Sequence, residues 1–143
     1  MKFNLRFSVA LQILIMCYLY KDTKITSNFL SSKIGADPAI IRQIMYELKK
    51  AGYILGKPGP GGTTLNIDLA KVSLEDVYNS VCDPNESILK IYDVPPNATE
   101  VERIIKEVSI SHFESYKKQL LNNMCNTSIM DLCNIITQQK EYN

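Results

Sequence analysis

The sequence predicts a mostly α-helical protein with one small β-hairpin and a long helix in its C-terminal third. Three observations lead to this expectation. Apolar residues recur with helical spacing over most of the chain. The turn residues "KPGPGG" interrupt this spacing at residues 57–62. A helical pattern of about 25 residues begins after Thr99. With 143 residues, the chain is one ordinary domain or a small domain with an appendage.

The first expected helix runs from Leu5 to Tyr20 and is apolar on most sides, which favours a central place in the fold. Its apolar run is too short to span a bilayer, so no membrane partner is expected. A second, short helix is predicted from Ser27 to Ile34. It ends at Gly35, because glycine tolerates the left-handed backbone that often closes a helix.

The third expected helix has the clearest start signal in the chain. Asp37 is a good N-cap, and Pro38 occupies the first helical position, where a missing N–H costs nothing. The spacing of its apolar residues predicts one buried face, and Gly52 marks the end of the helix. That face comprises Ile41, Ile44, Met45 and Leu48. A short helix, a tight turn and an amphipathic helix together form a helix-turn-helix.

Two short strands, expected at 53–56 and 64–67, follow directly. Pro58 and Pro60 between them cannot donate to a strand ladder, so the tip must stand away from the sheet. A helix-turn-helix followed by a β-hairpin is a winged helix. The alternative is an ordinary hairpin in an α+β protein.

The remaining chain reads as three helices and a loose segment. Ser73 and Asp76 form a capping box for a helix that runs to about Cys82. Thr99 begins the long helix, and Ser128 with Asp131 marks a sixth helix with a frayed tail over 138–143. We therefore predict a winged helix-turn-helix domain at 1–82, a flexible linker or sensor loop at 83–98, and dimerisation helices at 99–143.

The long helix would span roughly 40 Å, which is more than the preceding domain can cover. Its apolar stripe therefore predicts a partner helix, most simply from a second copy of the chain, although packing onto its own domain is the alternative. The candidate dimerisation residues are Val101, Ile104, Ile105, Val108, Phe113, Leu120 and Leu121.

Charge is divided unevenly along the chain. Residues 1–71 carry ten lysines and arginines against four acidic residues, a balance of +6, whereas residues 72–143 have a balance of −5. A basic first half indicates a polyanionic partner such as double-stranded DNA. A chance partition of surface charge is the alternative.

A DNA-reading helix enters the major groove with its N-terminal half. Arg42 can bind guanine, Gln43 can pair with adenine, and Ala39 and Pro38 can touch a thymine methyl group. A solvated helix face is the alternative for these residues. Contacts with the phosphate backbone are predicted for a further set of residues. This set comprises Arg6, Ser27, Asn28, Tyr46, Lys49 and Lys57. Lys57, at the base of the wing, is the best of them, for a phosphate or the minor groove. Plain solvation is an equal alternative for Tyr46 and Lys49, and the others are each a weak candidate.

The sequence offers no constellation for catalysis. His112 is the only histidine, and no nucleophile elbow, phosphate loop or Cys–His pairing is present. The four cysteines lack the C-x-x-C spacing of zinc and thioredoxin-like sites, which favours a reducing cytoplasm and no metal. Cys82 is the candidate redox sensor. No basic residue adjoins it in sequence, and Asp83 would raise its pKa, so an inert structural cysteine is the alternative.

Several segments resemble the Rrf-type winged-helix regulators, a bacterial family of transcriptional regulators. They are "RFSVALQIL", "LSSKIGADPAIIRQIMYELKKAGYI", "GPGG" and "VSLEDVYNSV", and the likeness is strong over residues 1–82. The resemblance implies a homodimer, coupled through the long helix, that binds a palindromic operator and usually represses. It places Ala39, Arg42 and Gln43 at base-reading positions. It also places Lys57, Gly59, Gly61 and Gly62 in the wing.

The chain departs from the family at two places. Pro58 stands where many relatives carry an arginine that enters the minor groove, and Lys57 is its candidate replacement. Cluster-binding relatives carry three closely spaced cysteines between the fourth helix and the long helix, whereas this chain has Cys82 alone. The cysteine nearest the long helix corresponds to Ala98, and Arg6 replaces an aspartate ligand of one relative. No iron–sulfur cluster or other cofactor is therefore expected.

The sequence thus predicts a sequence-specific, dimeric DNA-binding regulator, expected to be a repressor, without catalytic activity. Its signal could be redox chemistry, a protein partner or an unknown small molecule, held for example between the first helix and the long helix. The alternative is a protein-interaction or structural winged-helix module without specific DNA binding.

Overall fold

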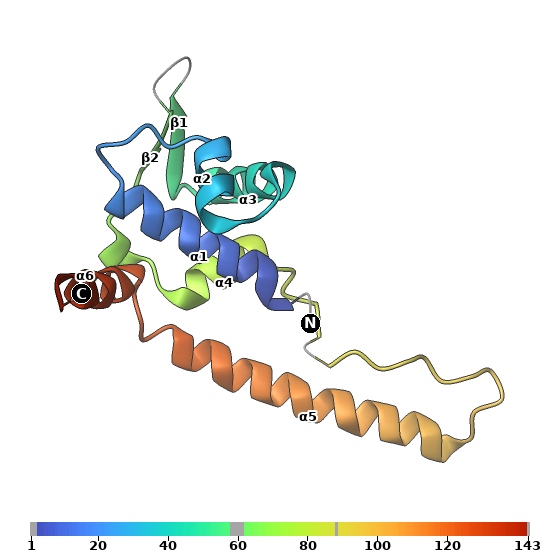
Figure 1. The fold of residues 1–143 in the computed structure, drawn as a ribbon. Helices are drawn as coiled ribbons and strands as arrows, with labels where there is room; N and C mark the ends of the chain where they lie inside the picture. The colour runs from blue at the N-terminus through green and yellow to red at the C-terminus, as the bar shows by residue number, and fades with distance from the viewer. Residues whose placement is uncertain (1–2, 58–61, 88, 143) are drawn as a thin grey trace.

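The computed structural model describes residues 3–57, 62–87 and 89–142. Along these residues it contains α1 (Phe3–Leu19), α2 (Ser27–Ile34), α3 (Pro38–Lys50), β1 (Ile54–Lys57), β2 (Gly62–Leu65), a 3-10 turn η2 (Leu69–Lys71), α4 (Leu74–Val81), α5 (Glu100–Met124) and α6 (Ile129–Tyr142). Figure 1 shows α1–α4 and α6 gathered in one globular part, with the hairpin at one end and α5 along the opposite side. The expected fold class, mostly helical with a small β-hairpin, is confirmed.

The turn between α2 and α3 is built from the residues that predicted it. The Thr26 side chain accepts a hydrogen bond from the backbone N–H of Phe29, and Gly35 closes α2 with a φ of 85°. The Asp37 carboxylate then accepts from the backbone N–H of Ala39 at 2.7 Å and opens α3. The Ser31 hydroxyl donates to the Ala36 carbonyl at 2.6 Å, which ties the end of α2 to the turn. These contacts fix the angle between the two helices.

Gly52 explains how α3 connects to the wing. It has a φ of 85°, its N–H donates to the Lys49 carbonyl, and the Tyr53 N–H donates to the Leu48 carbonyl. This is a Schellman arrangement, which satisfies the last carbonyls of the helix and turns the chain sharply. Strand β1 can therefore begin only two residues after Gly52.

The two strands differ from their predicted bounds. The sequence predicts strands at 53–56 and 64–67, whereas the structure has them at Ile54–Lys57 and Gly62–Leu65. Both observed strands therefore lie closer to the tip of the hairpin. The Tyr53 N–H donates to the Leu48 carbonyl at the end of α3, so β1 begins one residue later than predicted. Gly62, with a φ of 70°, pairs with Lys57 and begins β2 before the expected residue. The Thr63 N–H also donates to the Ile25 carbonyl at 2.9 Å, which attaches the wing to the segment before α2.

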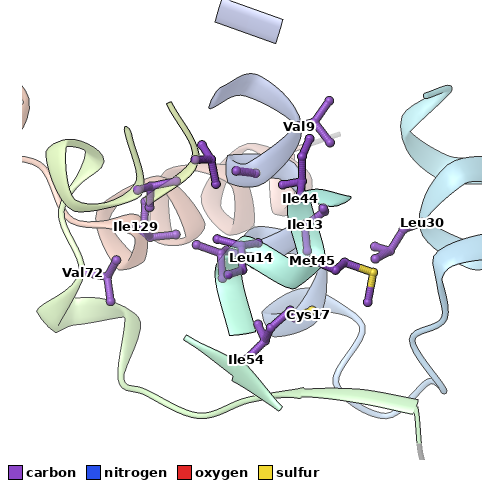
Figure 2. Packing of buried hydrophobic residues seen from close by; sticks show 14 of the residues in the cluster. Val9, Ile13, Leu14, Cys17, Leu30, Ile44, Met45, Ile54, Val72 and Ile129 are labelled. Atoms are coloured by element: carbon purple, nitrogen blue, oxygen red, sulfur yellow. The ribbon is translucent and has the colours of Figure 1, made fainter. Parts of the chain in front are cut away.

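Helix α1 is the centre of the hydrophobic core, as its apolar sequence predicted. Its Ile13 and Leu14 are fully buried, and Figure 2 shows them among side chains from α3, β1 and α6. The predicted inner face of α3 is also buried, and it comprises Ile41, Ile44, Met45 and Leu48. Each such aliphatic side chain contributes about 1.5–3 kcal/mol when fully buried.

Helix α6 returns to this core. The Ile129 N–H donates to the Val72 carbonyl at 2.8 Å, the Leu74 N–H donates to the Thr127 carbonyl, and Ile129 and Cys133 are fully buried. The predicted division into segments 1–82, 83–98 and 99–143 stays a prediction, but α6 shares the core of the first segment. The helix continues to Tyr142, so the expected frayed tail is wrong over its described part. Gln, Lys and Glu, which have good helical propensity, fill this last turn.

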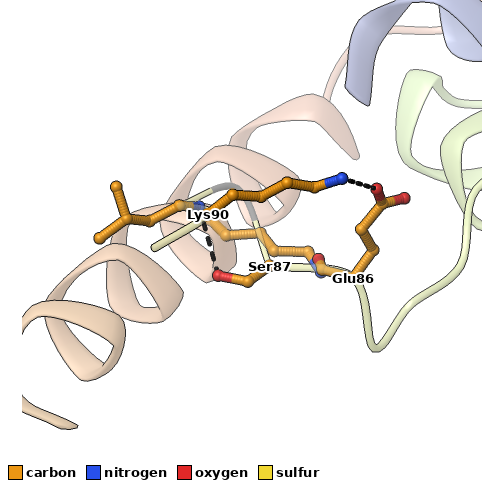
Figure 3. Close-up of polar contacts among 5 residues, drawn as sticks. Glu86, Ser87 and Lys90 are labelled. Atoms are coloured by element: carbon orange, nitrogen blue, oxygen red, sulfur yellow. Dashed lines mark hydrogen bonds and ion pairs between the residues drawn. The ribbon is translucent and has the colours of Figure 1, made fainter. Parts of the chain in front are cut away.

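The described residues between α4 and α5 form no helix or strand, so the short helix or strand that the sequence allows at 86–92 is absent from them. The flexibility of 83–98 stays a prediction. Figure 3 shows a local set of contacts within it, in which the Lys90 ammonium lies 3.6 Å from the Glu86 carboxylate and the Ser87 hydroxyl accepts from the Leu89 N–H. The α5 N-terminus then has the predicted Thr99 cap, with Glu102 as its capping-box partner. Lys106 pairs with Asp93 and holds this segment against α5.

The buried thiol of Cys17 predicts a loss of stability at high pH. Burial raises its pKa from 9.0 to about 12, so the unfolded chain ionises first and the free energy of unfolding falls as pH rises through this window. The expected loss is about 1.4 kcal/mol per pH unit for this thiol. Urea unfolding at pH 8, 10 and 11 of the parent and of Cys17→Val measures it as the difference in slope between the two proteins.

Tyr78 also lowers the free energy of unfolding as pH rises, in the parent and in Cys17→Val alike. Burial is the first cause that raises its pKa from 10.0 to about 12, and it contributes equally to parent and variant. Equal slopes in the two proteins would show that the Cys17 thiol does not carry the effect.

Candidate nucleic-acid interface

The outer face of α3 carries the residues that the sequence singled out for reading bases. Ala39, Arg42, Gln43 and Tyr46 are exposed, whereas the opposite face of the helix is buried against α1. The cap at Asp37 and the turn before it leave the N-terminal half of α3 at the surface. An exposed N-terminal half that carries Arg42 and Gln43 on a helix is the arrangement that can insert into the major groove.

Arg6 lies beside this face. A surface hollow of about 540 Å³ is lined by Arg6, Ala39, Arg42, Gln43, Tyr46 and Glu47. The fold therefore brings the start of α1 together with the candidate base-reading residues of α3. The Nε–H of Arg6 donates to the Val81 carbonyl at 2.9 Å, so one side of the guanidinium is engaged within the protein. A phosphate contact by the other nitrogen atoms stays a prediction.

Glu47 is a residue of this hollow that the sequence analysis missed. It follows Gln43 by one helical turn, which was the available signal. Its carboxylate repels phosphate, but a carboxylate can accept a hydrogen bond from the N4 amino group of cytosine. Glu47 thus places a negative charge at the edge of the candidate DNA-reading face.

Lys49 occupies a different place from the base-reading residues. A Cβ atom added to Gly56 would lie 2.9 Å from the Lys49 ammonium nitrogen, so Lys49 reaches across the base of the wing. Lys57 ends β1 at the same hairpin. Lys49 thus lies on the side of α3 that faces the wing, and its contact with DNA stays a prediction. Gly59 and Gly61 lie outside the described residues.

Gly62 has a structural reason to be glycine. Its φ is 70°, and an added Cβ would lie 3.0 Å from the Ile25 carbonyl oxygen. A side chain there would separate β2 from the segment that precedes α2. Ser27 and Asn28 lie in the first turn of α2, where Ser27 is half-buried and Asn28 is exposed. Their predicted contacts with the DNA backbone remain predictions.

Cys82 follows α4 directly and is half-buried. Burial is the largest cause that raises its pKa; Arg6 lowers the pKa, Glu86 raises it, and Lys117 lowers it again. The raised pKa agrees with the expectation, but its attribution to Asp83 is wrong, because burial and Glu86 act instead. The structure also brings two cations near the thiol that the sequence neighbours did not reveal. A protonated thiol reacts slowly, so this environment does not activate Cys82 at neutral pH.

A second surface of interest is the outer side of α5. Val101 is 63% exposed and Ile105 60%, and they lie within one apolar group of four residues. Helical periodicity places these four on one face of the N-terminal half of α5. The group consists of Val101, Ile104, Ile105 and Val108, and we call it the α5 apolar stripe.

The other candidate dimerisation residues divide into two kinds. Phe113 and Leu120 are exposed further along α5. Leu121 is half-buried and borders a hollow together with Pro84 and Lys117, so it faces the protein's own globular part. The predicted exposed apolar surface is therefore present on α5, but Leu121 lies beside it rather than within it.

The fold and the α3 face together define a winged helix-turn-helix DNA-binding regulator of transcription. The chain belongs to the Rrf2 family, whose model is described as an iron-dependent transcriptional regulator and matches residues 3–135. The family resemblance drawn from the sequence motifs is thus confirmed. No helix in the described part of the chain has the length and apolar content that a membrane crossing requires.

Individual relatives support the same class. The chain is 28% identical over 131 residues to YwnA of Bacillus subtilis (strain 168), provisionally named an HTH-type transcriptional regulator, and the match covers 92% of this chain and 96% of YwnA. A provisionally named transcriptional regulator from Lactobacillus plantarum has a similar crystal structure, with a TM-score of 0.77 and 23% identity over 98% of this chain and 99% of the other.

Two named regulators share the fold at lower identity. T. potens IscR has a TM-score of 0.63 at 16% identity, covering 92% of this chain and 85% of its own. Staphylococcus aureus CymR has a TM-score of 0.62 at 14% identity, covering 90% of this chain and 94% of its own. At these identities the likeness establishes the arrangement of the helices and the wing.

Because the family is described as iron-dependent, the question is whether the cysteines of this chain could bind an iron–sulfur cluster. Iron–sulfur clusters are held mainly by several cysteine thiolates. Here Cys17 and Cys133 are buried in the core, Cys125 is exposed at the end of α5, and Cys82 lies alone after α4. The cysteines are therefore distributed over separate parts of the fold. This donor set does not fit an iron–sulfur cluster.

Proposed function

We propose that the protein is a homodimeric repressor that binds a palindromic operator in the cytoplasm and works without an iron–sulfur cluster or catalysis. The observation that carries the proposal is the exposed α3 face, with Arg42 and Gln43 in its N-terminal half and the wing beside it. Arg42 would bind guanine and Gln43 adenine through the edges that these bases present in the major groove.

The homodimer is supported by the α5 apolar stripe. Four exposed aliphatic side chains on one helical face favour burial against a partner, and a second copy supplies the same face by symmetry. A twofold dimer would present two α3 helices to DNA. Its operator would then have two inverted half-sites, because the symmetry of the site follows the symmetry of the protein.

Regulation without a cluster is supported by the scattered cysteines. Cys82 remains the candidate for a thiol response, and its raised pKa favours an unreactive thiol under neutral conditions. Two hollows along α5 offer alternatives for a small-molecule effector, one lined by Val94 and Arg103 and one by Glu75 and Pro84. The first is lined by α5 and the segment before it, and the second also by α4. Neither is lined by α1, so neither corresponds to the pocket expected between the first helix and the long helix.

Fluorescence anisotropy with the DNA upstream of the protein's own gene, against a scrambled duplex, tests the proposal. We expect specific binding that weakens steeply with salt, with a log–log slope of about −0.9 for each phosphate neutralised. Titrations under reducing and oxidising conditions are run in parallel. Loss of binding on oxidation would point to Cys82, and indifference to oxidation would point to a ligand or protein signal.

Equal binding to the scrambled duplex would contradict sequence-specific regulation through this upstream DNA. Absence of both DNA binding and salt dependence would instead support a winged helix that binds protein. Sedimentation equilibrium tests the homodimer separately. A monomer found by this measurement would contradict the proposed homodimer whatever the operator is.

A further inference from the structure

Lys117 is a charged side chain buried at the attachment of α5 to the globular part. It is 4% exposed, whereas the neighbouring Tyr116 and Lys118 are exposed. Its ammonium donates to the backbone carbonyl of Pro84 at 2.9 Å and to that of Glu86 at 2.7 Å. Lysine is almost never fully buried without partners, so these two hydrogen bonds account for its position.

The surroundings of Lys117 connect three helices. Its ammonium lies 6.0 Å from the centroid of the buried Tyr78 ring on α4. The Tyr78 ring in turn packs edge-on against Phe7 of α1, with centroids 5.8 Å apart. The nearby carboxylates of Glu86 and Glu114 supply negative charge, since both add to the raised pKa of Tyr78 after the effect of burial. The site is therefore suited to a cation.

The same neighbourhood adjoins the DNA-reading face. Arg6, which lines the hollow beside Arg42, donates to the Val81 carbonyl at the end of α4. The chain then passes through Cys82 to Pro84, where Lys117 holds it from the side of α5. A continuous line of contacts thus runs from α5 through the end of α4 to the start of α1 and the α3 face.

The contact of α5 with the globular part is limited to one portion of this long helix (Figure 1). Helix α5 runs along the globular part and extends beyond it, and α4 is the helix against which it packs most closely. Lys117 is the buried residue of this long helix. The direction in which α5 leaves the winged helix therefore depends on few contacts, and the Lys117 hydrogen bonds are directional.

We propose that Lys117 is a positioning residue that sets the separation of the two recognition helices on the operator. The inference rests on the proposed homodimer. In such a dimer the α5 helices form the join, so the angle between α5 and the winged helix fixes the distance between the two α3 helices. Half-site spacing on DNA follows from that distance.

A buried apolar residue would serve stability as well or better, because a buried charge carries a large desolvation cost. A cation held by two carbonyl groups instead restricts the geometry of the segment it binds. The test must therefore measure spacing on DNA, which a purely stabilising side chain would not alter.

The test uses the full-length parent, Lys117→Met, Lys117→Arg and the control Lys118→Met, which removes an exposed charge from the next position. An operator is first selected from a random DNA library with the parent. Anisotropy then measures affinity for duplexes with the two half-sites at the selected spacing and at one and two base pairs more or fewer, and for a single half-site.

We expect Lys117→Met to remain a dimer and to bind the single half-site like the parent. It should lose the parent's preference for one spacing, with the ratio of affinities between best and altered spacing falling at least about fivefold. Lys117→Arg retains a cation that can donate to both carbonyls and should keep the preference, as should Lys118→Met. If Lys117→Met does not fold by circular dichroism, Lys117→Gln is judged by the same ratio.

A Lys117→Met or Lys117→Gln dimer that kept the parent's spacing preference would overturn the role of Lys117 and leave the proposed dimer intact. Loss of the preference in Lys117→Arg as well as in Lys118→Met would also overturn it, because the effect would then not depend on the buried cation. A monomeric parent, or one that prefers no spacing, would overturn the proposed dimeric function and this inference together.

Discussion

Replacing Ile105 by glutamate is expected to convert the protein from a dimer into a monomer. Ile105 is 60% exposed in the single chain and lies in the middle of the α5 apolar stripe. In a symmetric dimer the change would place an unpaired carboxylate in both halves of the interface, at a cost of about 3–5 kcal/mol for each buried charge. Sedimentation equilibrium measures the resulting shift, and operator affinity should fall to that of one half-site.

The matched control for this variant is Lys118→Glu, which puts the same side chain at an exposed position of α5 outside the stripe. It should leave the dimer unchanged. Circular dichroism should show the helical content of both variants to be that of the parent, because Ile105 makes no contribution to the buried core. A dimer that survived Ile105→Glu would place the interface elsewhere on the molecule.

Replacing Arg42 by alanine is expected to relax the preference for one base in each half-site. The guanidinium is exposed on the outer face of α3, and a bidentate pairing with guanine contributes about 1–3 kcal/mol of discrimination. Affinity should therefore fall for the selected operator and remain nearly level across substitutions at that one position. Anisotropy with a set of duplexes that vary each position in turn measures the change.

Lys50→Ala serves as the comparison, since it removes another exposed positive charge from the C-terminal end of α3. A phosphate contact there would weaken all duplexes alike and reduce the salt slope by about one. Base preferences should not change. If Arg42→Ala bound every operator variant in the same ratios as the parent, direct readout by Arg42 would be wrong.

Local signals made much of the fold predictable. Asp37 with Pro38, the glycines at 35 and 52, and the capping box of Ser73 each act within a few residues, and the structure uses all of them as expected. The buried face of α3 followed from its periodicity in the same way. Strand bounds were less accurate, because the end of α3 takes up Tyr53 and the pairing of Gly62 depends on a tertiary contact with Ile25.

The parts of the site that were missed depend on residues far apart in the chain. Arg6 meets Val81 across 75 positions, and Lys117 meets Pro84 across 33. No pattern within one helix indicates that a lysine among exposed neighbours will be buried. Glu47 could have been placed on the α3 face from its spacing, but its position beside Arg6 required the packing of α1 on α3.

The return of α6 to the core has a consequence for the order in which the protein can acquire its structure. Ile129 and Cys133 fill the same interior as Leu14 and Val72, so the DNA-reading part lacks part of its interior until residues near the C-terminus have been synthesised. During translation, α5 emerges from the ribosome before that interior is complete. Two nascent or newly released chains could therefore meet through α5 first and close their winged helices afterwards. A fragment that stopped at residue 82 would expose the apolar surface that α6 covers, even though it contains every element named as binding DNA.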